Sequence, residues 1–261
     1  MTNMKDMTNK ILTATALVIL AVACTQKAEQ PLRYGTLAVN LSGEPVVDVV
    51  SKTPVTLEQE SSEAANYMVR IYNSVNEKKY ESPFNTFKPQ VLPLGTYYVT
   101  AENCSATEAE VDNGKMRLYG RSSDVTLSLE NLSQSATVDC VVVNGKVTVV
   151  YDASVNGRFS GLKVVLTSGD RSLTVNETAT GVETETWFNP ATVTYTISGT
   201  FDPSGVNKTV NVSKTIDVKE RSNIQLLVKV NLNNGQLVPN VTFDTSIDDQ
   251  VTESGEFNPY E

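Results

Sequence analysis

The residue types that carry out most enzyme chemistry are scarce in this chain of 261 residues. It contains no histidine, which removes Ser-His-Asp and Cys-His catalysis and every imidazole-ligated metal site. Its three cysteines cannot form a four-thiolate zinc site. Two carboxylate pairs, Asp248 with Asp249 and Glu108 with Glu110, lie where we expect no pocket that would separate their pKa values. The sequence therefore predicts a protein that is not an enzyme and that holds no metal or cofactor.

The negative net charge of the chain limits the class of molecule that it can bind. The chain has 21 basic and 30 acidic residues, a net charge of -9 and an isoelectric point near 4.7. Nucleic acid is bound mainly through Lys and Arg contacts to phosphates. We therefore expect no nucleic-acid partner.

The first cysteine, Cys24, follows a sequence that is typical of export. Two lysines precede an uncharged run over residues 11–23, which is too short to span about 30 Å of hydrocarbon. The run ends in small residues directly before Cys24, an arrangement that resembles a bacterial lipoprotein signal. By this resemblance residues 1–23 are a signal peptide and Cys24 is the lipidated first residue of the mature chain, which anchors it to the membrane. An ordinary secretory signal and a spanning helix are the alternatives.

The resemblance to a lipoprotein signal predicts a cell-envelope protein, placed as a lipoprotein in the outer membrane. Whether it faces the surface or the periplasm stays open. Residues 24–34 are mostly polar and read as a tether.

The other cysteines, Cys104 and Cys140, have two possible states. An oxidising compartment permits a disulfide between them. Cys140 alternates with Val138 and Val142, which predicts that it points into a core. The alternative is therefore a buried free thiol at Cys140 and a loop thiol at Cys104.

Trp187, the only tryptophan, lies next to Phe188 directly before a predicted strand. Exposed rings of this kind can stack on the apolar C–H groups of sugars. The two residues are therefore a candidate ligand-binding pair. The alternative is that Trp187 fills a core or an interface between domains.

The elements that must position these residues are β-strands. The chain contains 36 Val and 30 Thr, which favour strands. Apolar residues alternate with polar ones in several runs, as expected when one face of a strand is buried. The clearest runs are 37–41, 193–198 and 224–232, and further strands are expected at 67–73, 95–101, 116–119, 125–129, 137–143, 146–151, 162–167 and 210–216.

Turn signals separate these runs. Hairpins are expected at residues 112–114, 144–145 and 233–235, because Asn-Gly tolerates the positive φ of a type I′ turn. Residues 144–145 could instead bend a long strand that passes from one domain into the next. The single helical candidate is residues 56–66.

Many short strands without a βαβ rhythm predict an all-β fold of antiparallel sheets. The length favours two tandem β-sandwich domains of immunoglobulin-like or transthyretin-like type. Their expected limits are 35–143 and 144–245, and residues 246–261 form an acidic tail.

Three stretches together carry a family resemblance. They are Gly35–Leu41, Leu92–Ala101 and Cys140–Val149. With the lipoprotein signal, they resemble a family of uncharacterised Bacteroidetes lipoproteins related to the fimbrillin-like cell-adhesion proteins. The resemblance implies tandem β-sandwich domains on a cell-envelope lipoprotein and no catalytic residue.

Fimbrillins polymerise by donating a strand after cleavage at an arginine. The resemblance makes Arg33, in the tether, and Arg70, in a predicted strand, the candidate processing sites. We expect adhesion or surface assembly through contact with an envelope or host protein. The alternatives are a glycan-binding lipoprotein for polysaccharide uptake and a spacer that holds another molecule away from the membrane.

Overall fold

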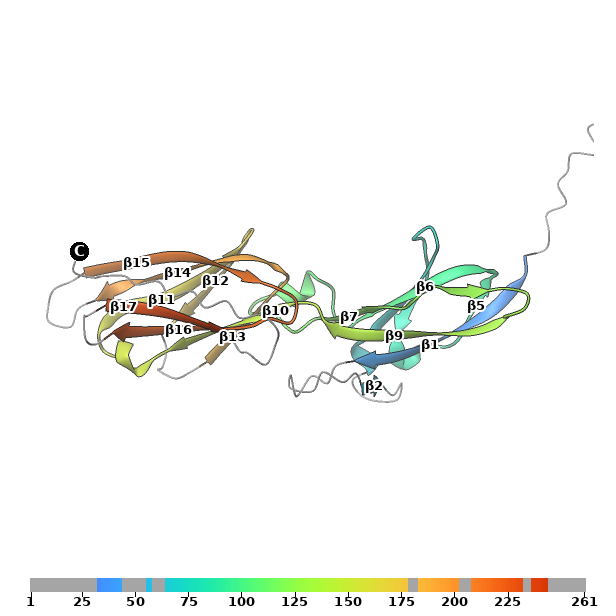
Figure 1. Ribbon diagram of the computed structural model, residues 1–261, viewed down its shortest axis with the longest axis horizontal. Coiled ribbons are helices and arrows are strands. Elements are labelled where there is room, and N and C mark those ends of the chain that lie inside the picture. The colour runs from blue at the N-terminus through green and yellow to red at the C-terminus, as the bar shows by residue number, and fades with distance from the viewer. Residues whose placement is uncertain are drawn as a thin grey trace, which may run out of the picture.

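The computed structural model describes residues 32–43, 55–57, 64–177, 183–201, 208–231 and 236–243. Within these ranges lie seventeen β-strands and four single-turn 3-10 helices, so the predicted all-β class is confirmed (Figure 1). The strands are β1 (Tyr34–Gly43), β2 (Val55–Leu57), β3 (Met68–Asn73), β4 (Lys78–Pro83), β5 (Gln90–Pro93), β6 (Gly95–Glu102), β7 (Leu118–Arg121), β8 (Val125–Leu127), β9 (Ser133–Val142), β10 (Gly145–Tyr151), β11 (Phe159–Ser168), β12 (Arg171–Asn176), β13 (Glu183–Phe188), β14 (Ala191–Phe201), β15 (Lys208–Val218), β16 (Asn223–Asn231) and β17 (Gln236–Phe243). The 3-10 helices are η1 (Ala64–Asn66), η2 (Phe84–Thr86), η3 (Glu108–Glu110) and η4 (Ala153–Val155). The described part of the chain contains no helix long and apolar enough to cross a membrane.

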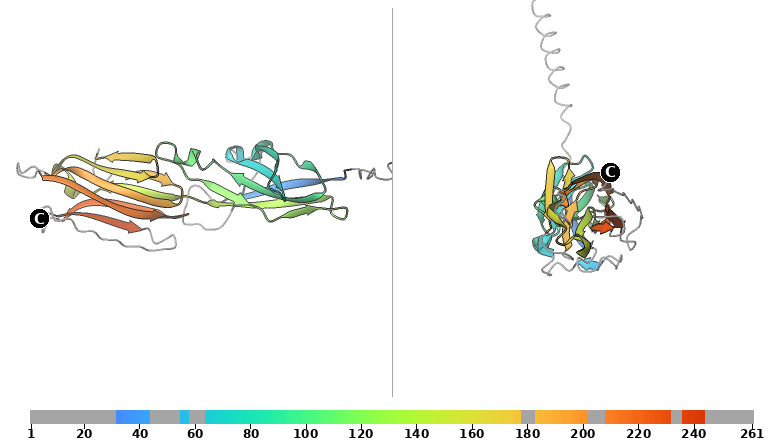
Figure 2. Two further views of the ribbon diagram at one scale, coloured as in Figure 1. Left: turned by 90° about the horizontal axis from the view of Figure 1, so that it is seen from above. Right: turned by 90° about the vertical axis from the view of Figure 1, so that its left-hand side faces the viewer.

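The strands form two bodies that lie end to end (Figures 1 and 2). The first half, β1 to β9, is one nine-stranded sheet system in the order β2-β1-β9-β7-β6-β3-β4, with β5 paired to β1 and β8 paired to β6. The second half, β10 to β17, has two four-stranded sheets in the orders β13-β10-β16-β17 and β12-β11-β14-β15.

Each half encloses its own hydrophobic cluster. One cluster draws its buried residues from Leu37 to Cys140, and the other from Val147 to Val228. The second cluster takes residues from both four-stranded sheets, so these two sheets pack on a shared core. The domain limits at 143 and 144 stay a prediction.

The period of two explains why these residues form strands. Ile224, Leu226 and Val228 on β16 are fully buried, while the residues between them are half-buried. Leu227, the exception to the alternation, lies with the polar residues on the outer face. The pattern therefore identifies which side of the strand packs on the core.

The prediction of purely antiparallel sheets is wrong at two places. β1 pairs with β9 in parallel, and β10 pairs with β16 in parallel. Every other strand pair in the described ranges is antiparallel. Each parallel pair joins strands far apart in sequence, which a local pattern of alternation does not reveal.

The three predicted hairpins have different outcomes. β16 and β17 do pair as antiparallel neighbours, with Asn231 opposite Gln236. Residues 112–114 do not join two strands, because residues 108–110 form η3. Asn144 lies between the end of β9 at Val142 and the start of β10 at Gly145, and these strands belong to different sheets, so residues 144–145 form no hairpin. The chain passes here from the first half into the second, but as two strands and not as one bent strand.

The helical candidate at residues 56–66 is wrong at its start. Residues 56 and 57 belong to β2, where Leu57 stands opposite Leu41 of β1, and residues 64–66 form the 3-10 turn η1. Residues 58–63 lie outside the described ranges. Pairing with β1 thus outweighs the local helix preference at the start of this segment.

Candidate functional surfaces

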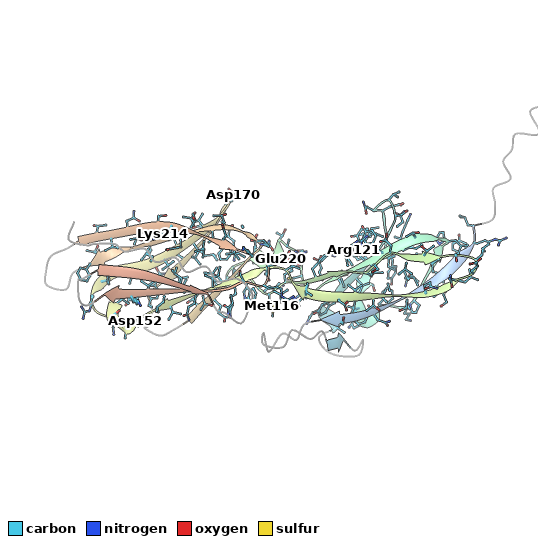
Figure 3. The ribbon with its side chains drawn as sticks, in the orientation of Figure 1. Met116, Arg121, Asp152, Asp170, Lys214 and Glu220 are labelled. Atoms are coloured by element: carbon cyan, nitrogen blue, oxygen red, sulfur yellow. The ribbon has the colours of Figure 1, made fainter. Side chains whose placement is uncertain are left out.

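The outer face of the first half gathers tyrosine and arginine side chains from three neighbouring strands. Arg70 and Tyr72 alternate along β3, and Tyr119 and Arg121 alternate along β7, so each pair lies on one side of its strand. The other side of these strands supplies the core. We call the set Arg70, Tyr72, Tyr98, Glu102, Arg117, Tyr119 and Arg121 the tyrosine–arginine face, with Arg121 labelled in Figure 3.

The rings of this face are held in place by one another. Tyr72 and Tyr98 stand opposite each other on β3 and β6, and their rings stack with centroids 5.2 Å apart and planes 13° apart. The guanidinium carbon of Arg121 lies 4.0 Å from the centroid of Tyr98, and its Nη2 donates to Asp124 at 2.9 Å. A stacked pair contributes about 0.5–1.5 kcal/mol, and an exposed cation–π contact about 0.5–1 kcal/mol. The rings are therefore ordered before any partner binds.

A buried carboxylate holds two of the three arginines of the face, Arg70 and Arg117. Glu102 is 8% exposed and accepts hydrogen bonds from Arg70 Nη1 at 2.6 Å and Arg117 Nη2 at 2.8 Å. Arg70 Nε also donates to Glu81 at 2.9 Å. Charge-assisted bonds of this kind are about twice as strong as neutral ones, so both guanidinium groups have a fixed direction.

Burial and neighbouring charges shift the pKa values of three groups in or beside this face, Arg70, Glu81 and Tyr119. Burial lowers the pKa of Arg70, but hydrogen bonds to Glu102 and Glu81 outweigh it and the net shift is upward. Hydrogen bonds from Lys78 and Arg70 lower the pKa of Glu81. Burial raises the pKa of Tyr119, so its ring stays neutral. On this face a neutral Tyr119 ring therefore lies on the same surface as a charged Arg70 guanidinium group.

A second cluster of polar contacts lies where the two halves meet, and its residues come from both. Asn144, between β9 and β10, is fully buried. Its Oδ1 accepts from the Arg117 amide at 3.0 Å, and its Nδ2 donates to the Lys115 carbonyl at 2.8 Å. Its own carbonyl accepts from the Arg221 amide at 2.9 Å. We call this region, residues 106–117, 144, 171, 187–189 and 221, the joint; the labelled Met116 and Glu220 mark its position in Figure 3.

Arg171 of β12 ties the halves together across the joint. Its Nη1 donates to the Trp187 carbonyl at 2.6 Å, and its Nη2 donates to the Asp112 carbonyl at 2.7 Å. Its guanidinium carbon lies 4.6 Å from the centroid of the Phe188 ring. In addition, the Trp187 amide donates to the Asn113 carbonyl at 2.8 Å.

Asn189 adds two further bonds across the joint. Its amide donates to Glu110 Oε1 at 3.1 Å, and its Nδ2 donates to the Ala106 carbonyl at 3.1 Å. Backbone groups on both sides are thus engaged, and such contacts fix position more tightly than pairs of long side chains do.

The structure places the predicted ligand-binding aromatic pair in this joint. Phe188 is fully buried in the core of the second half, so its prediction as a ligand-binding ring is wrong. Trp187 is half-buried, and both its amide and its carbonyl are used in the joint. The alternative interpretation of Trp187, a residue at the contact between domains, fits this position.

Cys104 and Cys140 are free thiols in the structure, so of the two predicted states it shows the unbridged one. Cys140 is fully buried, and its Sγ donates to the Ala101 carbonyl at 3.6 Å. Cys104 is also buried, with its Sγ 4.0 Å from the Met116 carbonyl. Burial raises the pKa of Cys140 to about 12 and also raises the pKa of Cys104.

The two candidate processing arginines have opposite surroundings. Arg33 is exposed and directly precedes β1, with its carbonyl bound by the Leu94 amide at 2.8 Å. Arg70 lies in β3, which is paired on both edges by β4 and β6. A protease needs an extended, accessible chain, so Arg33 is the more accessible of the two.

Several predicted features lie outside the described residues. They are the signal peptide at 1–23, Cys24, most of the 24–34 tether and the acidic tail at 246–261. Within the described ranges, no group of three or more His, Cys, Asp or Glu side chains could hold a metal ion.

Sequence reasoning missed most of the tyrosine–arginine face. It considered Arg70 only as a cleavage site. The available signal was the repeat of Arg and Tyr two residues apart, at Arg70 with Tyr72 and at Tyr119 with Arg121. Strand alternation places both residues of each pair on one face, but only the pairing of β3, β6 and β7 places the pairs side by side.

Comparison with known families and curated proteins gives one match. Residues 34–257 match the profile of a family described as a domain of unknown function, DUF4493. No curated protein matches the chain.

Solved structures that align with most of this chain include three proteins from Bacteroidetes. The fimbrial anchor protein Mfa2 from Porphyromonas gingivalis is 12% identical with a TM-score of 0.45, covering 84% of this chain and 100% of that one. A candidate cell adhesion protein from Bacteroides eggerthii is 13% identical with a TM-score of 0.48, covering 77% and 88%. A candidate polysaccharide-binding protein from Bacteroides thetaiotaomicron is 8% identical with a TM-score of 0.47, covering 84% and 99%. The fimbrial and adhesion proteins among them are of the group that the sequence resemblance names, and none of these likenesses transfers a function.

Proposed function

The chain belongs to the DUF4493 family, and we propose that this member is a lipid-anchored cell-envelope protein acting in adhesion or surface assembly through protein contacts. The acyl group of Cys24 anchors the chain in the outer membrane, and the folded part of the chain is exposed at the cell surface. The absence of histidine supports a binding role over a catalytic one.

The tyrosine–arginine face carries the proposal. Tyr and Arg are enriched in protein interfaces and dominate the residues whose truncation costs most binding energy. Tyr72, Tyr98 and Arg121 already stack on one another, so binding would freeze few additional rotamers. Preordering of this kind favours affinity because less side-chain entropy is lost on association.

The architecture supports the same role. We interpret each half as a β-sandwich domain, so that the pair forms a spacer with interaction sites along its length. The joint holds the halves end to end, and the sequence between Cys24 and β1 is short. A stiff, anchored molecule of this shape suits presentation of a binding face away from a membrane.

The two residues that suggested the glycan-binding alternative, Trp187 and Phe188, are not free to stack on a sugar. Phe188 is buried, and Trp187 is engaged in the joint. On the tyrosine–arginine face, the ring of Tyr98 is stacked against Tyr72 and covered by Arg121. Sugar stacking needs a free ring face, so protein contact is the better-supported role.

Site-specific photo-crosslinking on intact cells tests the proposal. A benzophenone amino acid replaces Tyr119 on the face or, as a control position, the exposed Thr215 on β15 of the second half. We expect a protein adduct from position 119 and none from position 215.

Charge reversal supplies the matched control. Arg121→Glu, at a side chain 48% exposed, should remove most of the adduct formed from position 119. Lys214→Glu, on the second half, should leave that adduct unchanged (Figure 3). The proposal is contradicted if no adduct forms from position 119 or if Arg121→Glu leaves the adduct intact.

A further inference from the structure

Large exposed apolar side chains gather at one end of the first half. Seven such residues occur in the described part of the chain, and the two outside this end are Val75 and Val111. The other five, with their exposed fractions, are Leu32 (70%), Tyr34 (50%), Val91 (68%), Leu129 (57%) and Leu132 (48%). We call these five residues the apolar pole.

The strand register brings the five together. Tyr34 on β1 pairs with Pro93 on β5, and Val91 lies two residues before Pro93 on the same strand. The Thr36 amide donates to the Leu132 carbonyl at 2.6 Å, which holds the end of the β8–β9 loop against β1. Figure 1 shows the start of β1 and β5 at the end of the first half that is remote from the second half.

The lipid attachment site is close to this pole along the chain. Leu32 comes eight positions after Cys24, and a fully extended chain spans at most about 3.6 Å per position, or about 29 Å here. An acyl group on Cys24 therefore confines the pole to within that distance of the bilayer, while the second half lies at the other end of the molecule.

We propose that the apolar pole rests in the headgroup–acyl boundary of the bilayer that holds the Cys24 lipid. This inference rests on the lipid anchor of the proposed function and adds a second, noncovalent membrane contact. An exposed apolar cluster marks an interaction surface, and a bilayer is the surface that the tether brings to it. Tyr34 has the amphipathic ring that is enriched at membrane interfaces, and the adjacent Arg33 is exposed and can meet lipid phosphates.

The contact fixes the orientation of the molecule. The covalent anchor alone does not fix the angle between the molecule and the membrane. A pole seated in the interface holds the long axis of the first half across the membrane plane, so the second half points away from the bilayer. The tyrosine–arginine face, on the side of the first half, then stays accessible.

Spin-label accessibility on the full lipidated protein tests this contact. The protein is reconstituted in vesicles of phosphatidylethanolamine and phosphatidylglycerol, with a nitroxide attached at Leu129→Cys. The matched control is Val111→Cys, because Val111 is 58% exposed and lies in the joint. The native Cys104 and Cys140 are buried and should not take the label.

We expect the nitroxide at 129 to show a several-fold higher ratio of oxygen to nickel-chelate collisions than the nitroxide at 111. Equal ratios at the two positions, in protein whose mass shows an acylated Cys24, would overturn the contact and leave the anchor standing. Broadening at 129 that disappears on dilution with unlabelled protein would identify a second copy as the occupant and would also overturn it. A mass without acyl groups would remove the anchor, and with it both proposals.

Discussion

Burial decides the chemistry of the thiol of Cys140. Its pKa is raised to about 12, because the ionised form would lie in the core of the first half. The thiolate is the nucleophile toward alkylating reagents, so a protonated, buried thiol reacts slowly. We expect iodoacetamide at pH 8 to leave Cys140 unmodified in the folded protein and to alkylate it in denaturant, as read by peptide mass. Fast alkylation without denaturant would show that the core is open at this strand.

The same shift predicts how stability depends on pH. The folded pKa lies above the unfolded value of about 8.5, so the folded state retains the proton while the unfolded state loses it. The contribution of this thiol is complete below about pH 8.5 and is lost as pH rises toward 12. In urea titrations, the wild-type protein should lose stability over this range more steeply than Cys140→Ala. Parallel pH profiles would contradict this assignment.

Glu102 is the shared carboxylate partner of Arg70 and Arg117 on the tyrosine–arginine face. Glu102→Gln leaves Arg117 without its carboxylate partner and Arg70 with Glu81 alone. Removing one partner from a mostly buried ion pair should cost about 2–3 kcal/mol in the free energy of unfolding. Glu185→Gln, which breaks an ion pair with Lys146 at a side chain 51% exposed, should cost at most about 1 kcal/mol. Equal losses in urea unfolding would show that the Glu102 cluster is solvated.

At the scale of elements, Gly114 tests the close approach of the two halves. It has φ of +76°, and a Cβ there would lie 2.6 Å from the Trp187 carbonyl oxygen and 2.7 Å from that of Ala109. Gly157 has a similar φ of +65° but open space around it. Gly157→Ala should therefore cost only the left-handed strain, about 1–2 kcal/mol, whereas Gly114→Ala should cost about 1–3 kcal/mol more.

Urea unfolding of the two alanine variants provides the measurement. A matching loss in both would mean that the segment after η3 does not press against β13, and the joint as described would be incorrect.

Strand alternation was enough to predict most of the individual strands. In β14, Val193, Tyr195 and Ile197 are buried, as their spacing predicts. Pairing partners were not predictable in the same way, because β1 and β9 are joined in parallel across nearly the whole first half. Local patterns carry no information on such long-range pairs.

The candidate surfaces likewise include features that a local sequence pattern predicts and features that depend on long-range contacts. Burial of Cys140 follows from its alternation with Val138 and Val142, and sequence reasoning found it. The joint could not be found this way, because the Arg171 side chain reaches a carbonyl 59 residues earlier in the sequence. Trp187 was likewise a candidate residue in the sequence, but the sequence does not show that its backbone amide and carbonyl form the hydrogen bonds of the joint.

At the scale of the whole molecule, the joint predicts a rigid relation between the halves. Double electron–electron resonance between labels at the exposed positions Thr137→Cys and Asn156→Cys should give one narrow distance distribution. Arg171→Ala removes the bonds to the Trp187 and Asp112 carbonyls and should broaden it. Lys163→Ala, at an exposed position on β11, serves as the control and should leave it unchanged. A broad distribution in the wild-type protein would mean that the halves move independently.

Metabolic labelling combined with protease treatment of intact cells shows whether the protein is acylated and displayed at the cell surface. Cells are grown with an alkyne fatty acid, treated intact with a protease that does not enter them, and assayed for the full-length labelled band. We expect the band to carry the label in the wild-type protein, to lack it in Cys24→Ser, and to disappear when intact cells are treated with protease. A band without label would show that Cys24 is not acylated, and a labelled band that survives protease on intact cells and is lost only after lysis would show that the protein is not displayed at the surface.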